Sequence, residues 1–130
     1  MSNKLLLLFV VLYMVINCGA GGEVYEVTAY CSCKRCCGKW ADGITASGKP
    51  AVWGVVAADW KVLPKGTRIT LSCFPGQTFT VLDIGGAIKG RRIDVWFPSH
   101  REALEFGRKK GIKLTVKGKT NGKGKSVRTR

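Results

Sequence analysis

The chain of 130 residues carries a formal net charge of +14 and is 45% hydrophobic. This length accommodates one domain with one modest core, so we expect a single folded unit. The sequence contains no Ser/His/Asp constellation, no GxxxxGK phosphate loop and no internal repeat. These absences exclude several common routes to nucleophilic catalysis and nucleotide binding.

The N-terminus has the pattern of an export signal. Lys4 precedes an unbroken apolar run of twelve residues, 5–16, and small residues follow at 18–22. The run is too short for an ordinary membrane span, and the order of the segments predicts a secretory signal peptide over residues 1–20, cleaved near Ala20. An uncleaved anchor and lipidation at Cys18 are alternatives, and Asn17 disfavours the second. We therefore expect a secreted or cell-wall-associated protein.

The first strand is expected at residues 23–30, where polar side chains alternate with apolar or aromatic ones. A cysteine-rich loop follows. The mature domain would keep five cysteines, Cys31, Cys33, Cys36, Cys37 and Cys73. The CxxC spacing at positions 33 and 36 allows a zinc site, but no second CxxC is present and the one histidine, His100, is distant in sequence. We favour a disulfide between the cluster and Cys73, with no metal.

The middle of the chain predicts further strands separated by turn signals. Residues 40–50 are dominated by Gly, Ser, Thr, Asp and Pro, which is typical of a surface loop. Apolar or alternating runs predict strands at residues 52–58, 67–73, 77–82 and 92–97. The second and third of these flank Phe74-Pro75-Gly76, so we expect them to form an antiparallel hairpin.

A short helix and a last strand complete the expected domain. Ser99 followed by Glu102 forms a capping box, which predicts a helix start. We expect this helix to place His100 exposed in its first turn, to bury Ala103, Leu104 and Phe106, and to end near Gly111. Residues 112–116 alternate again. Six short strands and one helix over residues 23–116 indicate an all-β fold, a small closed barrel without exposed strand edges.

The C-terminal segment is strongly basic. Residues 108–130 contain ten Lys or Arg and no acid, and residues 117–130 have almost no apolar side chains. This composition predicts a disordered basic tail over 117–130. A tail of this kind binds polyanions with little sequence preference, and anionic envelope polymers are the partners we expect of an exported protein rather than a specific nucleic acid. A tail that only aids solubility is an equal alternative.

Carboxylates that end or interrupt apolar runs are the candidate catalytic groups. Asp83 and Asp94 flank a loop with three glycines in the six residues 85–90, and Asp59 follows another apolar run. A carboxylate in an apolar strand is costly unless it is paired or its pKa shifts. The simpler interpretation is that these aspartates cap turns or pair with neighbouring Lys and Arg. Trp60 and Trp96 are close to them in sequence and could stack on sugar rings.

These segments together resemble the 3D domain, a domain named for three aspartates that occurs in exported cell-wall proteins. The resemblance covers residues 27–106 and is carried by Cys36-Cys37-Gly38, Thr45-Ala46-Ser47-Gly48, Val56-Ala57-Ala58-Asp59, Leu63-Pro64-Lys65-Gly66-Thr67, Asp83-Ile84-Gly85-Gly86-Ala87-Ile88-Lys89-Gly90 and Arg92-Ile93-Asp94. The domain is similar to the catalytic barrel of a membrane-bound lytic transglycosylase. Ile84 stands where Thr or Val is usual, and the cysteine loop and basic tail are not part of the shared pattern.

The resemblance implies a six-stranded double-psi β-barrel that cleaves the MurNAc-GlcNAc bond of peptidoglycan without water and leaves a 1,6-anhydro end. It places Asp94 as general acid/base, with Asp83 and Asp59 completing the trio. The residues expected to contact glycan are Thr45, Trp60, Gly85, Gly86, Lys89 and Trp96. No cofactor is implied, and the oligomeric state stays open.

A lytic transglycosylase can work with one acid, since the 6-hydroxyl of the sugar attacks after the leaving oxygen is protonated. That acid must be protonated at working pH, which an apolar strand and a neighbouring carboxylate both favour. Two other functions stay open. An expansin-like module would bind wall glycan without cutting it, and a polyanion binder would act through the basic tail.

Overall fold

A computed structural model of the protein describes residues 22–119. The signal peptide expected at residues 1–20 and the tail beyond residue 119 lie outside this range. The elements in chain order are β1 (Glu23–Tyr30), α2 (Lys34–Cys37), the 3-10 helix η1 (Gly38–Trp40), β2 (Val55–Ala58), β3 (Thr67–Leu71), β4 (Thr78–Asp83), β5 (Arg92–Trp96), α3 (His100–Phe106) and β6 (Lys109–Lys119). The helices within residues 22–119 are too short to span a membrane.

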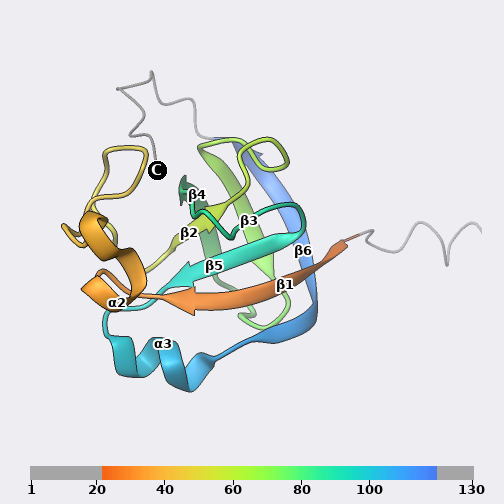
Figure 1. The fold of residues 1–130 in the computed structure, drawn as a ribbon. Coiled ribbons are helices and arrows are strands. Elements are labelled where there is room, and N and C mark those ends of the chain that lie inside the picture. The colour runs from red at the N-terminus through yellow and green to blue at the C-terminus, as the bar shows by residue number, and fades with distance from the viewer. Residues whose placement is uncertain (1–21, 120–130) are drawn as a thin grey trace, which may run out of the picture.

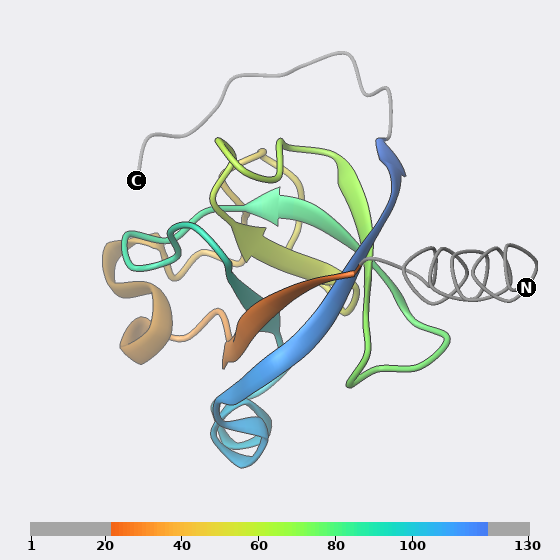
Figure 2. The same cartoon turned by 90° about the vertical axis from the view of Figure 1, so that its right-hand side faces the viewer.

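The strands form a closed barrel in the order β1-β5-β2-β4-β3-β6, which confirms the six-stranded all-β barrel expected from the sequence. Figure 1 shows β1 and β5 side by side and α3 below them, and Figure 2 shows β6 crossing beside β1. Two pairs are parallel, β1 with β5 and β2 with β4. β3 and β4 form the expected antiparallel hairpin. Parallel neighbours need long connections, and these connections carry the loops of the site.

Alternation along the strands fills the barrel with apolar side chains. The enclosed core consists of Tyr25, Val27, Val56, Ala58, Leu63, Ile69, Leu71, Phe79, Val81, Ile93, Val95 and Leu114. The side chains between these positions face outward. On β2, all four residues are buried, because the outward-facing Ala57 is covered by a second small cluster with Tyr30 and Ile88. The outer face of β2 is therefore also covered.

An aromatic cluster packs against this core. Trp53 makes edge contacts with Phe74, Phe79 and Phe97 at ring-centroid distances of 5.3–5.6 Å, and Phe106 of α3 stacks on Phe74 at 5.4 Å. The rings join the loop before β2, the β3–β4 turn and the helix. Such ring pairs add to stability beyond the area that they bury.

The helix α3 differs from its expected extent. Its capping box is confirmed, since Ser99 accepts a hydrogen bond from the Glu102 backbone N–H. It ends at Phe106 rather than near Gly111, because Gly107 adopts φ 67° and ends the helix. Leu104 is 67% exposed, so the expectation that it faces inward is wrong, whereas Ala103 is buried. β6 then runs on to Lys119, past the boundary expected at residue 116.

Candidate active site

The candidate site is built on the outer face of β2, between β4 and β5. Ala57 pairs in parallel register with Asp83 of β4 and in antiparallel register with Asp94 of β5. The two aspartates therefore lie at the same level of the barrel wall, one strand away from Ala57 on either side. Asp83 and Asp94 are thus on next-but-one strands of the barrel wall, with β2 between them.

Asp94 is the half-buried acid of the site. On β5 the side chains of Ile93 and Val95 point into the core, so alternation turns Asp94 outward. Its Oδ1 accepts a hydrogen bond of 3.0 Å from the Thr28 hydroxyl on the adjacent strand β1. Burial raises the pKa of the Asp94 carboxyl to about 6 and the charge of Asp83 adds to this, whereas Thr28 and Arg92 act in the opposite direction. This carboxyl can therefore carry a proton in mildly acidic conditions.

Asp83 is almost completely buried, with 1% of its surface exposed. Its Oδ2 accepts a hydrogen bond of 2.8 Å from the Tyr30 hydroxyl, and its Oδ1 accepts from the backbone N–H groups of Ala46 and Ile84 at 2.9 and 3.0 Å. Both carboxylate oxygens are thus engaged by the protein. Asp83 fixes the loop around Ala46 and the end of β1 against the barrel, and it has little surface left for a substrate.

Asp59 holds the glycine loop. Its Oδ2 accepts a hydrogen bond of 3.0 Å from the backbone N–H of Gly90, and its Oδ1 accepts from that of Lys61. These two N–H groups, with the charge of Lys89, lower the pKa of the Asp59 carboxyl. A carboxyl with a lowered pKa stays ionised near neutral pH, so Asp59 is suited to positioning this loop and not to donating a proton.

The glycine loop folds back on itself through Gly85. The Ile88 N–H donates to the Gly85 carbonyl at 3.1 Å, and a Cβ on Gly85 would lie 2.8 Å from Ile88 Cγ1. The missing side chain lets Ile88 pack into the small cluster over Ala57. Gly86 and Lys89 are exposed, as a residue that contacts glycan must be.

Thr45 was expected to contact glycan, but its side chain is buried inside its own loop. It is fully buried, and its hydroxyl bonds to Ser47 Oγ at 2.7 Å and to the Lys49 carbonyl at 2.8 Å. These bonds close the loop on itself, and the Ser47 N–H donates to the Leu82 carbonyl on β4 at 3.0 Å. Thr45 therefore shapes the loop that lies against Asp83 and has no surface for a ligand.

The two tryptophans beside the aspartates are half-buried and anchored. The Trp60 indole N–H donates to the Asp83 carbonyl at 3.1 Å, and its ring packs against the core. The Trp96 indole N–H donates to Ser32 Oγ at 2.9 Å, and its ring packs against the cluster of Tyr30, Ala57 and Ile88. Trp96 lies on the outward face of β5 with Asp94, so it is the better placed of the two for contact with a sugar.

An open cavity of about 370 Å³ touches Asp94. It lies between the β1/β5 pair and α3, and its lining residues are Thr28, Ala29, Arg92, Asp94, Ala103, Leu104, Gly107 and Arg108. Thr28 and Tyr30 are the functional candidates that the sequence did not single out. The alternation of residues 23–30 was the available signal, since it puts Thr28 on the outward face, but nothing local indicates which carboxylates these hydroxyls meet.

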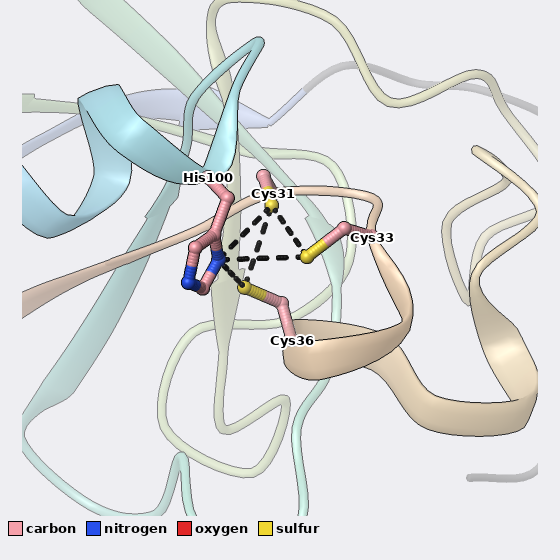
Figure 3. A group of neighbouring side chains, drawn as sticks. All are labelled: Cys31, Cys33, Cys36 and His100. Carbon is pink, nitrogen blue, oxygen red and sulfur yellow. Dashed lines mark hydrogen bonds between the residues drawn. The ribbon is translucent and has the colours of Figure 1, made fainter.

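Within residues 22–119 no disulfide joins the cysteines, so the bridge expected between the cluster and Cys73 is absent from the structure. Cys73 is half-buried against the barrel core. Cys31, Cys33 and Cys36 instead converge on His100, with the four ligand atoms all within 4.8 Å of one another. His100 is half-buried rather than exposed. Figure 3 shows its ring beside the three sulfurs.

Comparison with known protein families gives a match to the region of the chain that carries this site. The family model of the 3D domain matches residues 54–117, a range that contains Asp59, Asp83 and Asp94. The resemblance inferred from the sequence is thereby confirmed for residues 54–117, which match the 3D domain.

Proteins of Bacillus subtilis (strain 168) are similar in sequence. The putative cell wall shaping protein YabE is 37% identical over 92 residues, which are 68% of this chain and 22% of that protein. The cell wall-binding protein YocH is 39% identical over 69 residues, 50% of this chain and 23% of that protein. The SPbeta prophage-derived protein YorM is 37% identical over 86 residues, 63% of this chain and 35% of that protein. The chain thus spans about a fifth to a third of these relatives.

Among solved structures, the lytic transglycosylase MltA of Escherichia coli is similar to this chain at 28% identity. One of its crystal structures aligns with a TM-score of 0.48 and covers 58% of this chain and 27% of that chain. The named activity of MltA belongs to that protein.

Proposed function

We propose that this protein acts on the glycan strands of peptidoglycan at the cell wall, as a lytic transglycosylase with Asp94 as its general acid. The support for the place of action is that relatives 37–39% identical to part of this chain are described as cell wall shaping and cell wall-binding proteins. The observation that carries the chemistry is the environment of Asp94. Its pKa is raised to about 6 by burial, and it borders an open cavity.

The state of the other carboxylates favours a non-hydrolytic reaction. A hydrolase needs a second carboxylate as nucleophile or to activate water. Both oxygens of Asp83 are engaged in a buried position, and both oxygens of Asp59 accept backbone hydrogen bonds. Within residues 22–119, only Asp94 in the aspartate trio has an oxygen, Oδ2, to which no hydrogen bond is directed. One available acid suits a reaction in which the substrate supplies its own nucleophile.

In the proposed reaction, protonated Asp94 donates its proton to the glycosidic oxygen while the bond from that oxygen to C1 of MurNAc breaks. The 6-hydroxyl of the same MurNAc then forms a bond to C1, and its proton passes to the Asp94 carboxylate. This returns the acid to its starting state and consumes no water. Asp83 and Asp59 position the surrounding loops, while Trp96 and Lys89 contact the glycan.

The test is mass spectrometry of fragments released from purified peptidoglycan by the full-length chain, with Asp94→Asn beside it. Anhydro-muramyl fragments from the wild type, reduced at least about a hundredfold in the variant, are expected. Glu105→Gln is the matched control, because it removes an exposed carboxylate of α3 that pairs with Arg101 and is outside the site. Fragments with reducing ends would contradict the proposal and indicate hydrolysis.

A second candidate is a module that binds wall glycan without cutting it, and the similarity to YocH favours it. The same experiment separates the two functions. Sedimentation of the chain with peptidoglycan, unchanged by Asp94→Asn and without released fragments, would establish binding alone. The export of the protein and the affinity of its basic tail for anionic envelope polymers are part of either proposal.

A further inference from the structure

The cysteine loop after β1 converges with the start of α3. Cys31, Cys33 and Cys36 come from six consecutive residues, while His100 lies 64 residues after Cys36. Figure 3 shows the three sulfurs and Nδ1 of His100 pointing toward a common centre. Residues this far apart in the chain meet only because β1 and β5 run in parallel and release their following segments at the same end of the barrel.

The spacing of these atoms fits a tetrahedral metal ion. Zinc with Zn–S of about 2.3 Å and Zn–N of about 2.0 Å places two sulfurs about 3.8 Å apart and sulfur and nitrogen about 3.5 Å apart. Nδ1 of His100 lies 3.5 Å from the sulfurs of Cys33 and Cys36 and 3.8 Å from that of Cys31. The Cys31 sulfur lies 3.1 Å from that of Cys33 and 3.4 Å from that of Cys36. Small outward shifts of the thiols complete the geometry.

The local structure has few other sources of stability. The helix α2 has four residues, none of them buried, and its N-cap residue Cys33 makes no capping hydrogen bond through its side chain. A helix of this length does not persist by itself. A metal bound by Cys33 and Cys36 would hold this turn from both ends. Lys34 and Arg35 between them would offset the net negative charge of three thiolates around a divalent ion.

We propose that Cys31, Cys33, Cys36 and His100 bind one zinc ion as a structural site. Four protein ligands fill a tetrahedral shell and leave no open position for a substrate, which distinguishes this site from a catalytic zinc. Binding releases the three thiol protons, and the His100 ring binds through Nδ1 with its remaining proton on Nε2. The proposal does not depend on the activity proposed for Asp94.

The site joins the ends of the two strands that carry the candidate active site. Cys31 directly follows Tyr30, whose carbonyl accepts a hydrogen bond of 2.7 Å from the Phe97 N–H. His100 begins α3 shortly after Trp96, which bonds to Ser32 inside the cysteine loop. Zinc would therefore fix the ends of β1 and β5 just beyond the pair Thr28 and Asp94.

The first test is the zinc content of the full-length chain, purified with a non-thiol reductant and without chelator. We expect about one zinc per chain by elemental mass spectrometry. Co²⁺ in place of zinc should give the thiolate charge-transfer and intense ligand-field absorption of a tetrahedral sulfur-rich site. A chain that retains neither metal after incubation with Zn²⁺ or Co²⁺, or that carries a disulfide within the cluster under these conditions, would overturn the proposal.

The second test compares ligand variants with matched controls. Cys33→Ser and His100→Ala should lower zinc affinity by on the order of a hundredfold, whereas His100→Cys should retain the ion through a fourth thiolate. Cys37→Ser and Cys73→Ser remove cysteines outside the cluster and should keep about one zinc per chain. Equal zinc in Cys33→Ser and the wild type would contradict the assignment.

A third measurement uses the wild-type chain and therefore does not depend on whether a ligand variant folds. Removing zinc from the wild type with a chelator should lower its unfolding midpoint by more than about 5 °C, and adding Zn²⁺ back should restore it. Cys73→Ser should respond in the same way. An unchanged midpoint in a chain that has been shown to lose its zinc would exclude a structural role.

Discussion

The Tyr30 hydroxyl donates a hydrogen bond of 2.8 Å to Asp83 Oδ2, although the two residues are 53 positions apart in the chain. Burial and the adjacent Asp83 raise the pKa of the Tyr30 hydroxyl far above its usual value, so it stays protonated and acts as a donor. Tyr30 also ends the strand β1, which carries Thr28 against Asp94. The strand β1 thus supplies one hydroxyl to each of two aspartates. These two hydrogen bonds join β1 to β4, which carries Asp83, and to β5, which carries Asp94.

Replacing Tyr30 by Phe should destabilise the protein by about 1–3 kcal/mol, because the variant leaves Asp83 Oδ2 buried without its donor. Urea unfolding of the full-length chain measures this loss. Tyr25→Phe is the matched control, since Tyr25 is also a buried tyrosine of β1 but its hydroxyl makes a longer hydrogen bond of 3.4 Å to Glu23. Equal losses in the two variants would show that the Tyr30 hydrogen bond contributes little.

Replacing Asp94 by Asn should stabilise the protein at neutral pH by up to about 3 kcal/mol. The pKa of Asp94 is raised from 3.8 to about 6 in the folded state, so the folded protein binds a proton that the unfolded chain has released between these values. The contribution of the Asp94 carboxyl to the free energy of unfolding of the wild type is therefore fully present below about pH 4 and is lost as the pH rises through about 6. Because Asp94 is only half-buried, solvent screening makes this stability change smaller but does not alter its sign.

The measurement for Asp94→Asn is the free energy of unfolding of both proteins from pH 4 to pH 8. The difference between the two curves isolates Asp94 from the other carboxylates. It should grow between pH 4 and pH 6 and be constant above pH 7. A difference that does not vary with pH would mean that burial does not raise the pKa of this carboxyl.

Several features of the barrel could be predicted from the sequence because they depend on local patterns. Alternation and turn signals indicated all six strands, and the capping box of Ser99 and Glu102 located the start of α3. The helix end was misplaced because two glycines could end it. Gly107 does so, and Gly111, which also has a positive φ, lies inside β6. The sequence pattern alone does not distinguish these two positions.

The missed features all depend on contacts between distant segments. The thiols of residues 31–36 meet His100 only after β1 and β5 pair in parallel, which sequence spacing does not reveal. Thr45 belongs to one of the motifs that resemble the 3D domain, yet its hydroxyl forms hydrogen bonds only within its own loop. The sequence correctly predicted that Asp83 and Asp94 lie on strands or strand ends, since Asp83 ends β4 and Asp94 lies within β5. The three aspartates differ in their hydrogen bonds because different donors surround each one in the folded barrel.

Replacing Thr28 by Val should move the pH dependence of the proposed cleavage to higher pH. The protonated form of Asp94 is the acid, so the rate of fragment release should fall as the pH rises through about 6. The Thr28 hydroxyl lowers the pKa of Asp94, and its loss raises that pKa. Thr70→Val on β3, which is not a neighbour of β5 in the barrel, should leave the profile unchanged. A shift to lower pH would contradict the role of Asp94 as the acid.

Replacing Gly85 by Ala should destabilise the glycine loop by about 1–3 kcal/mol, whereas Gly86→Ala should have little effect. A Cβ at position 85 would lie 2.8 Å from Ile88 Cγ1. Ile88 is buried in the small cluster over Ala57, so moving its side chain away from this Cβ would disturb that packing or the loop. A Cβ at position 86 meets no heavy atom within 4 Å. The adjacent positions therefore form a matched pair with the same chemical change.

Hydrogen exchange of the Ile88 and Gly90 amides, together with urea unfolding, measures the effect of these alanine variants. Ile88 packs over Ala57, and the Gly90 N–H donates to Asp59, so a displaced loop should expose both amides in Gly85→Ala. Fragment release from peptidoglycan should fall with the same variant, because the loop borders the strand that carries Asp94. Normal exchange with reduced release would instead assign Gly85 a direct contact with the glycan.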